Sequence, residues 1–129
     1  MIWLTRNMVE AFHRESLARF GGADGLRDEG LLLSALARAQ NIHVYNPGAD
    51  LFHLAAAYCA GVVKNHPFVD GNKRTGILSA VVFLGLNGIE PNFDEAMVVT
   101  MVYGLAAGEI SEDALAEWFR VSAVNPQPA

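Results

Sequence analysis

The stretch that decides the fold is His66-Pro67-Phe68-Val69-Asp70-Gly71-Asn72-Lys73-Arg74, a polar segment between two apolar ones. Before it, residues 50 to about 65 would be apolar on nearly every side of a helix, and the chain is apolar again from Thr75 to about Leu86. A helix that is hydrophobic all round is a buried helix, and proline disfavours the helical conformation for the residue that precedes it. The sequence therefore predicts two buried central helices joined by a polar loop at His66.

The remainder of the chain also has helical spacing. Apolar residues recur at intervals typical of helices, and capping or breaking residues mark the ends, such as Thr5 before the first helix and Gly21-Gly22 after it. The expected helices cover about 5–20, 28–40, 50–65, 70–87, 94–107 and 111–121. With 129 residues, the fold prediction is an all-α, compact single-domain bundle of about six helices over residues 1–124, followed by a disordered tail at 125–129.

One connection departs from the helical pattern. From Asn41 to Ala49 the periodicity breaks, and Asn46-Pro47-Gly48 is typical of a turn. We expect a loop here, with Ile42, Val44 and Tyr45 as a short extended piece.

Composition narrows the class of protein. The net charge of −5 argues against direct binding of nucleic acid or of an anionic membrane, because both need a basic footprint. Cys59 is the single cysteine, so no internal disulfide is possible and a small buried residue is expected. The first residues lack the order of a signal peptide, and no apolar run is long enough for a bilayer. We expect a soluble cytoplasmic protein.

The start of the second central helix has an unusual charge pattern. Lys73 and Arg74 fall in its first turn, where the helix already carries partial positive charge, so two cations oppose that field. A bound anion would reverse the effect. Free N–H groups at Gly71, Asn72 and Lys73, together with the helix dipole and the two cations, would form a phosphate site.

Two neighbours complete a possible active site. Asp70 lies just before this phosphate site, where a carboxylate is a natural ligand for Mg²⁺. His66 has an ordinary pKa suited to a general base near neutral pH. Base, metal ligand and phosphate site together meet most requirements of phosphoryl or nucleotidyl transfer to a hydroxyl group.

Simpler interpretations exist for each residue taken alone. Asp70 would be a helix N-cap, His66 a structural histidine, and Lys73 and Arg74 solvated cations. Lys64 either adds a cation near the phosphates or favours the dipole at its helix end. The other three histidines, His13, His43 and His53, fall in no metal-ligand spacing, and Phe68 is expected to point into the core.

These residues resemble the signature of the Fic family, His-x-Phe-x-Asp/Glu-Gly-Asn-Gly-Arg-x-x-Arg. The chain matches it at His66, Phe68, Asp70, Gly71, Asn72 and Arg74. Lys73 replaces a glycine and Ile77 replaces the second arginine, and both departures resemble the Doc ("death on curing") toxin branch. Arg19-Phe20-Gly21-Gly22 and Gly108-Glu109-Ile110-Ser111 are also similar to segments of that branch.

The resemblance implies an activity and a set of roles. Members with glycine in place of Lys73 mostly transfer AMP from ATP, whereas the Doc branch is similar to a kinase that moves the γ-phosphate of ATP to a threonine of elongation factor Tu and stops translation. By this likeness His66 would be the base, Asp70 would hold Mg²⁺ and orient His66, and Asn72, Lys73 and Arg74 would hold phosphates. An AMP-transferase and a catalytically inactive nucleotide-binding module remain alternatives.

The resemblance also implies partners. In the family, the segment that corresponds to 41–49 is a flap that aligns the target chain by strand pairing; an ordinary surface loop is the alternative. Family members are often blocked by a Ser/Thr-x-x-x-Glu-Gly/Asn helix, but the chain's single Glu-Gly pair, Glu29-Gly30, has Gly25 four residues earlier. We therefore expect control by a separate antitoxin, a helical segment of which would lie in a groove of the toxin.

Overall fold

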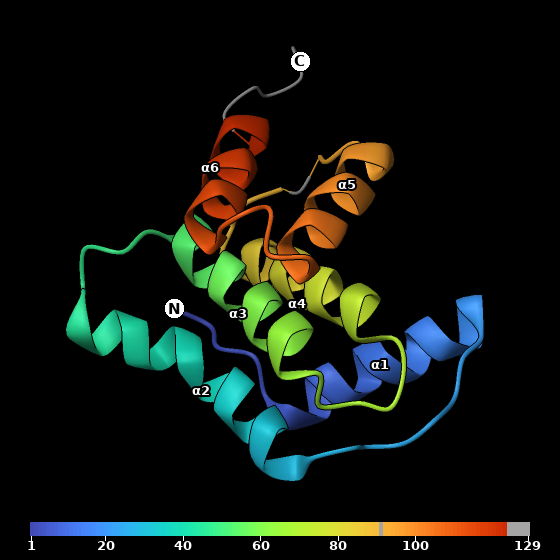
Figure 1. Cartoon of the computed structure of the whole chain (residues 1–129). Helices are drawn as coiled ribbons and strands as arrows, with labels where there is room; N and C mark the ends of the chain where they lie inside the picture. Colours follow the sequence, from blue (N-terminus) through green and yellow to red (C-terminus); the bar gives the residue numbers. More distant parts are fainter. Residues whose placement is uncertain (91, 124–129) are drawn as a thin grey trace.

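The computed structural model describes residues 1–90 and 92–123 (Figure 1). Within these residues the chain forms six helices: α1 (Arg6–Phe20), α2 (Glu29–Tyr45), α3 (Leu51–Asn65), α4 (Asn72–Leu86), α5 (Glu95–Ala106) and α6 (Glu112–Ala123). The extended pairing in this part of the chain is a single antiparallel bridge between Leu26 and Phe68. The predicted all-α bundle is confirmed, whereas the predicted tail at 125–129 lies outside the described residues.

Helix α3 is the centre of the molecule. Residues 54–63 are all buried, and helices α2, α4 and α6 pack against α3 from different sides (Figure 1). This arrangement follows from a helix with apolar residues on every face, which can be buried only by neighbours all round. Cys59 belongs to this core, where burial raises the pKa of its thiol to about 12.

The N-terminus of α4 differs from those of the other helices. At the start of each of the other five helices, a side-chain oxygen accepts a hydrogen bond from a backbone N–H of the first turn. The accepting side chains are those of Thr5, Asp28, Asp50, Asp94 and Ser111. Helix α4 begins at Asn72, and its N-cap residue is Gly71, which has no side chain to accept such a bond. Its first N–H groups are therefore left for another acceptor.

The predicted end of α2 is wrong. The helix continues to Tyr45, so residues 41–45 are helical and form no extended piece. Ile42 packs against the core and continues the buried face that includes Ala39, and this packing outweighs the local break that asparagine suggests. The expected pairing of a target chain with an extended segment at 41–45 is not available in this structure.

No helix in the described part of the chain combines the length and apolar character that crossing a bilayer requires.

Candidate active site

The motif loop, residues 66–71, joins the ends of the two central helices. α3 ends at Asn65 as predicted, and His66 follows in a left-handed conformation, with φ 53° and ψ 53°. Gly71 is also left-handed, with φ 79°, a conformation that glycine adopts without strain. His66 is exposed while its backbone is fixed at the end of a buried helix. The backbone that carries the imidazole is therefore fixed, while the imidazole itself is accessible to solvent.

A segment before α2 holds the backbone of the motif loop. The backbone N–H groups of Arg27 and Asp28 donate to the Pro67 carbonyl, at 2.7 and 3.0 Å. The Val69 N–H donates to the Gly25 carbonyl at 2.9 Å. These bonds join parts of the chain that are far apart in sequence, and they restrict the motion of the loop.

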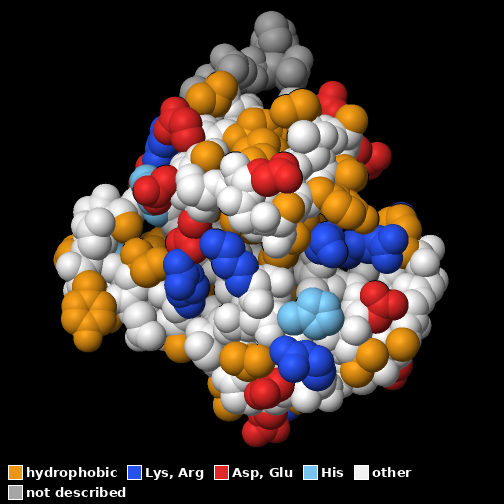
Figure 2. All heavy atoms as spheres, viewed as in Figure 1, with side chains coloured by type: hydrophobic (Ala, Val, Ile, Leu, Met, Phe, Trp, Pro, Cys, Tyr) orange, Lys and Arg blue, Asp and Glu red, His pale blue; other side chains and the backbone are white. Residues whose placement is uncertain are grey.

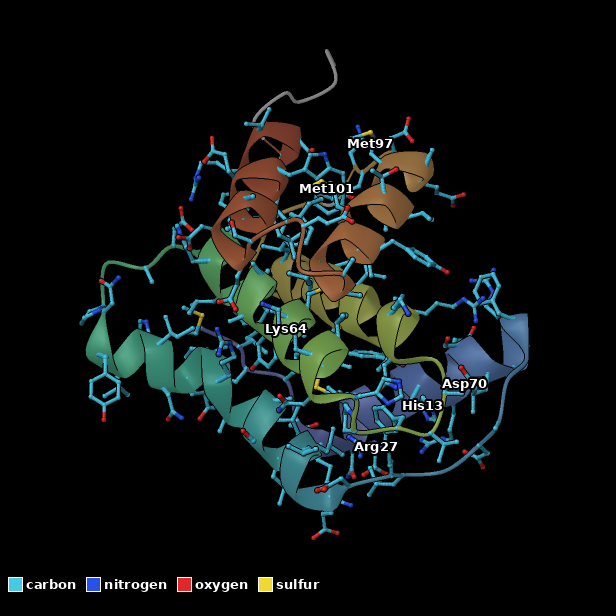
Figure 3. All side chains as sticks on the ribbon, in the orientation of Figure 1. His13, Arg27, Lys64, Asp70, Met97 and Met101 are labelled. Atoms are coloured by element: carbon cyan, nitrogen blue, oxygen red, sulfur yellow. The ribbon has the colours of Figure 1, made fainter. Side chains whose placement is uncertain are left out.

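The side chain of Arg27 completes this support (Figure 3). Its guanidinium donates to the carbonyl oxygens of His66 at 2.7 Å and Asn65 at 2.9 Å. A cation is favourable there because the C-terminal carbonyls of a helix carry partial negative charge. Arg27 therefore fixes the backbone that carries His66.

The inner face of the motif loop packs on a histidine. Phe68 is 2% exposed, as predicted, and its ring stacks on His13 with centroids 3.9 Å apart. His13 Nε2 lies 2.8 Å from the Asp70 carbonyl oxygen, so this nitrogen carries the proton and donates. His13 therefore supports the motif loop from below, a role that its position in the sequence did not indicate.

The side chain of Asn72 is structural. It is buried and bonds to both backbone groups of Phe68, accepting from the N–H at 3.0 Å and donating to the carbonyl at 2.9 Å. Its amide therefore closes the motif loop. The side-chain amide of Asn72 is thus engaged within the protein, and its backbone N–H is the donor that faces the start of α4.

Asp70 is not the cap of α4. Its Oδ1 accepts the Gly71 N–H at 2.8 Å and its Oδ2 accepts the Ala23 N–H at 3.2 Å. The bond from Gly71, the bond from Ala23 and the nearby Arg74 charge lower the pKa of Asp70. The simpler interpretation as an N-cap is wrong, and so is the expectation of a free N–H at Gly71. Gly22 lies so close that a Cβ there would be 2.7 Å from Asp70 Oδ2.

The unpaired N–H groups at the N-terminus of α4, called here the open end of α4, begin at Asn72 and not at Gly71 as expected. The first backbone bond at this end runs from the Thr75 N–H to the Gly71 carbonyl at 3.0 Å. The N–H groups of Asn72, Lys73 and Arg74 precede that bond and have no acceptor within the helix. Lys73 and Arg74 are exposed, so three N–H groups and two cations meet at one helix end.

The predicted site residues line one cleft of about 500 Å³. One wall carries the polar residues of the motif, namely His66, Asp70, Gly71, Asn72, Lys73 and Arg74. The opposite wall is the apolar face of α5 with Val98, Val99, Val102, Tyr103 and Ala106. Figure 2 shows several Lys and Arg side chains gathered on the same face of this acidic protein. The cleft thus combines a cationic wall with an apolar one.

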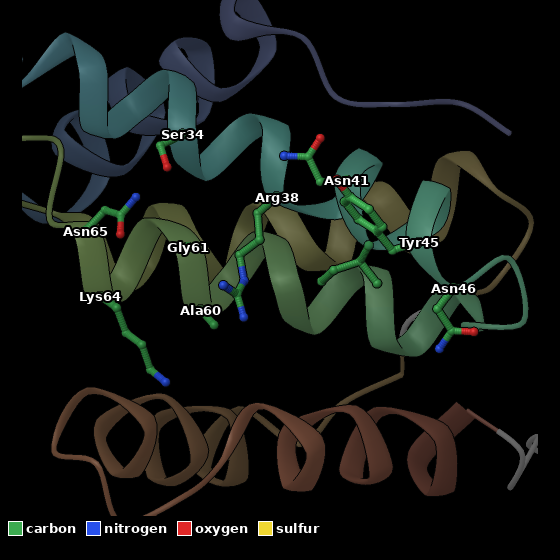
Figure 4. Close-up of a pocket in the computed structure, with 10 residues that line it drawn as sticks. Ser34, Arg38, Asn41, Tyr45, Asn46, Ala60, Gly61, Lys64 and Asn65 are labelled. Atoms are coloured by element: carbon green, nitrogen blue, oxygen red, sulfur yellow. The ribbon is translucent and has the colours of Figure 1, made fainter.

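Lys64 lies away from this cleft. It lines a second hollow of about 540 Å³ between α2 and α3, together with Arg38 and Tyr45 (Figure 4). Its position at the last turn of α3 fits the interpretation as a cation that favours the helix dipole.

The residues of the cleft can be compared with what a magnesium ion requires. The described residues contain no group of three His, Cys, Asp or Glu side chains that could hold a metal. Of the described residues that line the cleft, only Asp70 carries a carboxylate. Mg²⁺ is commonly bound by one or two carboxylates with phosphate oxygens and water, so the residues fit a metal that arrives with a phosphate ligand.

Comparison with known proteins identifies the family of the chain. The model of the Fic/DOC family matches residues 3–84, which include the motif loop. The chain is 36% identical over 110 residues to "Protein kinase doc" of Escherichia phage P1, covering 85% of this chain and 86% of that protein. It is 35% identical over 117 residues to "Toxin Doc" of Mycolicibacterium smegmatis, covering 84% and 90%. The chain is a member of the Fic/Doc family.

Proposed function

We propose that this protein is the toxin of a toxin–antitoxin system and a protein kinase that transfers the γ-phosphate of ATP to a hydroxyl group of a translation factor, elongation factor Tu. The observation that carries the proposal is the uncapped N-terminus of α4, where three N–H groups, Lys73 and Arg74 face a cleft that His66 and Asp70 also line. The relative named as a protein kinase supports the kinase reaction, and both relatives carry the Doc name.

The phosphates of ATP would bind at the open end of α4. Backbone N–H groups and a helix dipole bind anions without any conformational change, and Lys73 and Arg74 add two charges. Mg²⁺, held by Asp70 and phosphate oxygens, would neutralise charge on the transferred group. The lowered pKa of Asp70 extends the ionised range of this carboxylate to more acidic pH.

His66 would act on the acceptor. Its imidazole takes the proton of the acceptor hydroxyl while the hydroxyl oxygen forms a bond to the γ-phosphorus of ATP. The bond between that phosphorus and the bridging oxygen breaks, and ADP leaves with the electron pair. The rigid backbone of His66, held by Arg27, would keep the imidazole in place for this step.

Lys73 favours γ-phosphate transfer over AMP transfer. In the AMP-transferases that the motif resembles, glycine leaves room for phosphates deep in the site. The lysine stem fills that room and adds charge, which suits a reversed nucleotide. Here Lys73 lines the cleft, so the same reasoning applies to this chain.

The decisive experiment uses ATP labelled at either the α- or the γ-phosphate, with purified elongation factor Tu as acceptor. We expect label from the γ position only, and mass spectrometry should show addition of one phosphate. Label from the α position would instead indicate AMP transfer. Nucleotide binding without transfer of either label would favour the inactive module, and transfer only to other proteins of a cell extract would refute the acceptor.

An antitoxin is the second proposed partner. The chain lacks the inhibitory Glu-Gly/Asn segment in its own sequence, and a relative is named as a toxin. We propose that a helical segment of a separate protein lies in a groove of this one and blocks it. With this reaction and this acceptor, the protein would act in the cytoplasm.

A further inference from the structure

The two cations at the open end of α4 each contact an aromatic side chain from outside the motif. Arg74 Cζ lies 4.3 Å from the centroid of the Phe20 ring, and Lys73 Nζ lies 5.1 Å from the centroid of the Tyr103 ring. Phe20 is the last residue of α1, and Tyr103 lies on α5. We propose that Phe20 and Tyr103 are positioning residues that hold Arg74 and Lys73 ready for a phosphate ligand. The inference rests on the proposed function.

Packing in the hydrophobic core does not explain the positions of the Phe20 and Tyr103 rings. Phe20 is 62% exposed and Tyr103 is 61% exposed. Side chains that remain so exposed contribute little to the core, and a cation above the ring is the contact that the structure gives them. Tyr103 lines the cleft, whereas Phe20 contacts Arg74, which lines it. Both contacts are possible because α1 and α5 pack against α4.

Neither Lys73 nor Arg74 forms an ion pair within 4.0 Å with a described residue. The ion pairs in this part of the chain involve Arg6, Arg38, His53 and Arg120, and the Arg74 charge acts on Asp70 only from a longer distance. A carboxylate partner would have to be displaced before a phosphate could bind. An aromatic face attracts a cation through its quadrupole and leaves the charge in place.

Aromatic contact also preserves the donors. A ring that covers the face of a guanidinium leaves the N–H groups at its edge free, and an ammonium above a ring keeps donors on its other side. Long flexible side chains lose rotational freedom when they bind, and earlier positioning reduces that loss. The rings should therefore strengthen phosphate binding without touching the phosphate.

The test compares paired substitutions. Tyr103→Leu and Phe20→Leu remove the ring, whereas Tyr103→Phe and Phe20→Tyr keep it. The matched control is Met97→Ala, on the same helix as Tyr103, 43% exposed and outside the cleft lining. Calorimetry with Mg²⁺ and ATP should show affinity about two- to fivefold weaker for each leucine variant, and unchanged affinity for the aromatic variants and the control.

A second measurement needs no ligand. Ring current from Tyr103 should shift the ε-protons of Lys73 upfield in the wild type and in Tyr103→Phe, and the shift should be lost in Tyr103→Leu. An unchanged Lys73 shift in Tyr103→Leu would overturn the inference. Equal nucleotide affinity of the leucine and aromatic variants would overturn it while leaving the proposed function intact. A wild type that binds no nucleotide would overturn both.

Discussion

The N-termini of α3 and α4 both begin central helices, but they satisfy their first N–H groups in opposite ways. At α3, Asp50 accepts the His53 N–H at 3.0 Å and an ion pair from Arg120 at 2.6 Å. At α4, Gly71 offers no side chain, and the first turn carries cations. One end is closed by the protein's own carboxylate, whereas the other has no side-chain cap and is the anion site that we propose.

The difference separates stability from function. A capped end contributes to folding whether or not a ligand is present. An open, cationic end costs stability until an anion binds, as is common at functional sites. Changes at α3 should therefore alter stability alone, and changes at α4 should alter binding and catalysis.

The largest effect is expected at the loop that leads into α4. His66→Asn should lower kcat by about 10²–10⁴-fold, because the general base is lost, with little change in melting temperature since His66 is exposed. Asparagine is chosen because it tolerates the left-handed conformation at this position. Initial-rate kinetics with labelled ATP measure the effect, and full activity in this variant would exclude His66 as the base.

Reversing the charge at the open end of α4 should weaken ATP binding and raise the free energy of unfolding. Lys73→Glu places an acidic residue in the first turn of α4, as Glu29 stands in the first turn of α2. Affinity for ATP should fall roughly 10- to 100-fold through loss of a charge-assisted contact. The free energy of unfolding should rise by about 0.3–1 kcal/mol through a better match to the dipole.

Calorimetry and urea denaturation measure the two quantities on the same preparation. A variant with less stability and unchanged affinity would show that the open end of α4 is not an anion site.

At the capped N-terminus of α3, a substitution should lower stability and leave nucleotide affinity unchanged. Asp50→Ala removes the cap of α3 and should lower the free energy of unfolding by about 1–2 kcal/mol. Nucleotide affinity should not change, because Asp50 does not line the cleft. Urea denaturation checks the first expectation, and an effect on ATP binding equal to that of Lys73→Glu would remove the contrast between the two ends.

The smallest effect is a pH dependence at the same cap. Burial raises the pKa of Asp50, but bonds from the His53 N–H, Arg120 and the His53 ring outweigh it and lower the pKa from 3.8 to about 2. Between these values the unfolded chain binds more protons than the folded one, so stability falls as the pH falls. The contribution is complete above pH about 4 and is lost as the pH decreases toward about 2.

Asp50→Asn should remove this part of the acid sensitivity. Denaturation of both proteins should give a stability difference that is constant above pH about 4 and shrinks below it. A difference that stays constant down to pH about 2 would contradict the assignment to Asp50.

Local sequence patterns predict the two central helices, and the motif predicts the polar residues that line the cleft. Pro67 marks the end of α3, and continuous apolar sequence marks burial, so both were evident without the structure. The predicted end of α2 was wrong, because Ile42 packs on the core and the helix continues past the neighbouring asparagine.

The supports of the site were not predictable from spacing. His13 and Asp70 are 57 positions apart, and Arg27 and His66 are 39 apart, so only the tertiary fold brings them together. Arg19-Phe20-Gly21-Gly22 resembles a segment of the family, but two contacts of this segment required the tertiary structure: Arg74 Cζ lies over the Phe20 ring, and Gly22 leaves room for Asp70.

The most direct test of the open end of α4 is a titration of the isotope-labelled protein with Mg²⁺ and ATP, followed by backbone amide NMR. We predict the largest shifts at the N–H groups of Asn72, Lys73 and Arg74, with little change at the capped start of α3, residues 51–53. Saturating nucleotide that left the first turn of α4 unshifted while amides elsewhere moved would contradict the account.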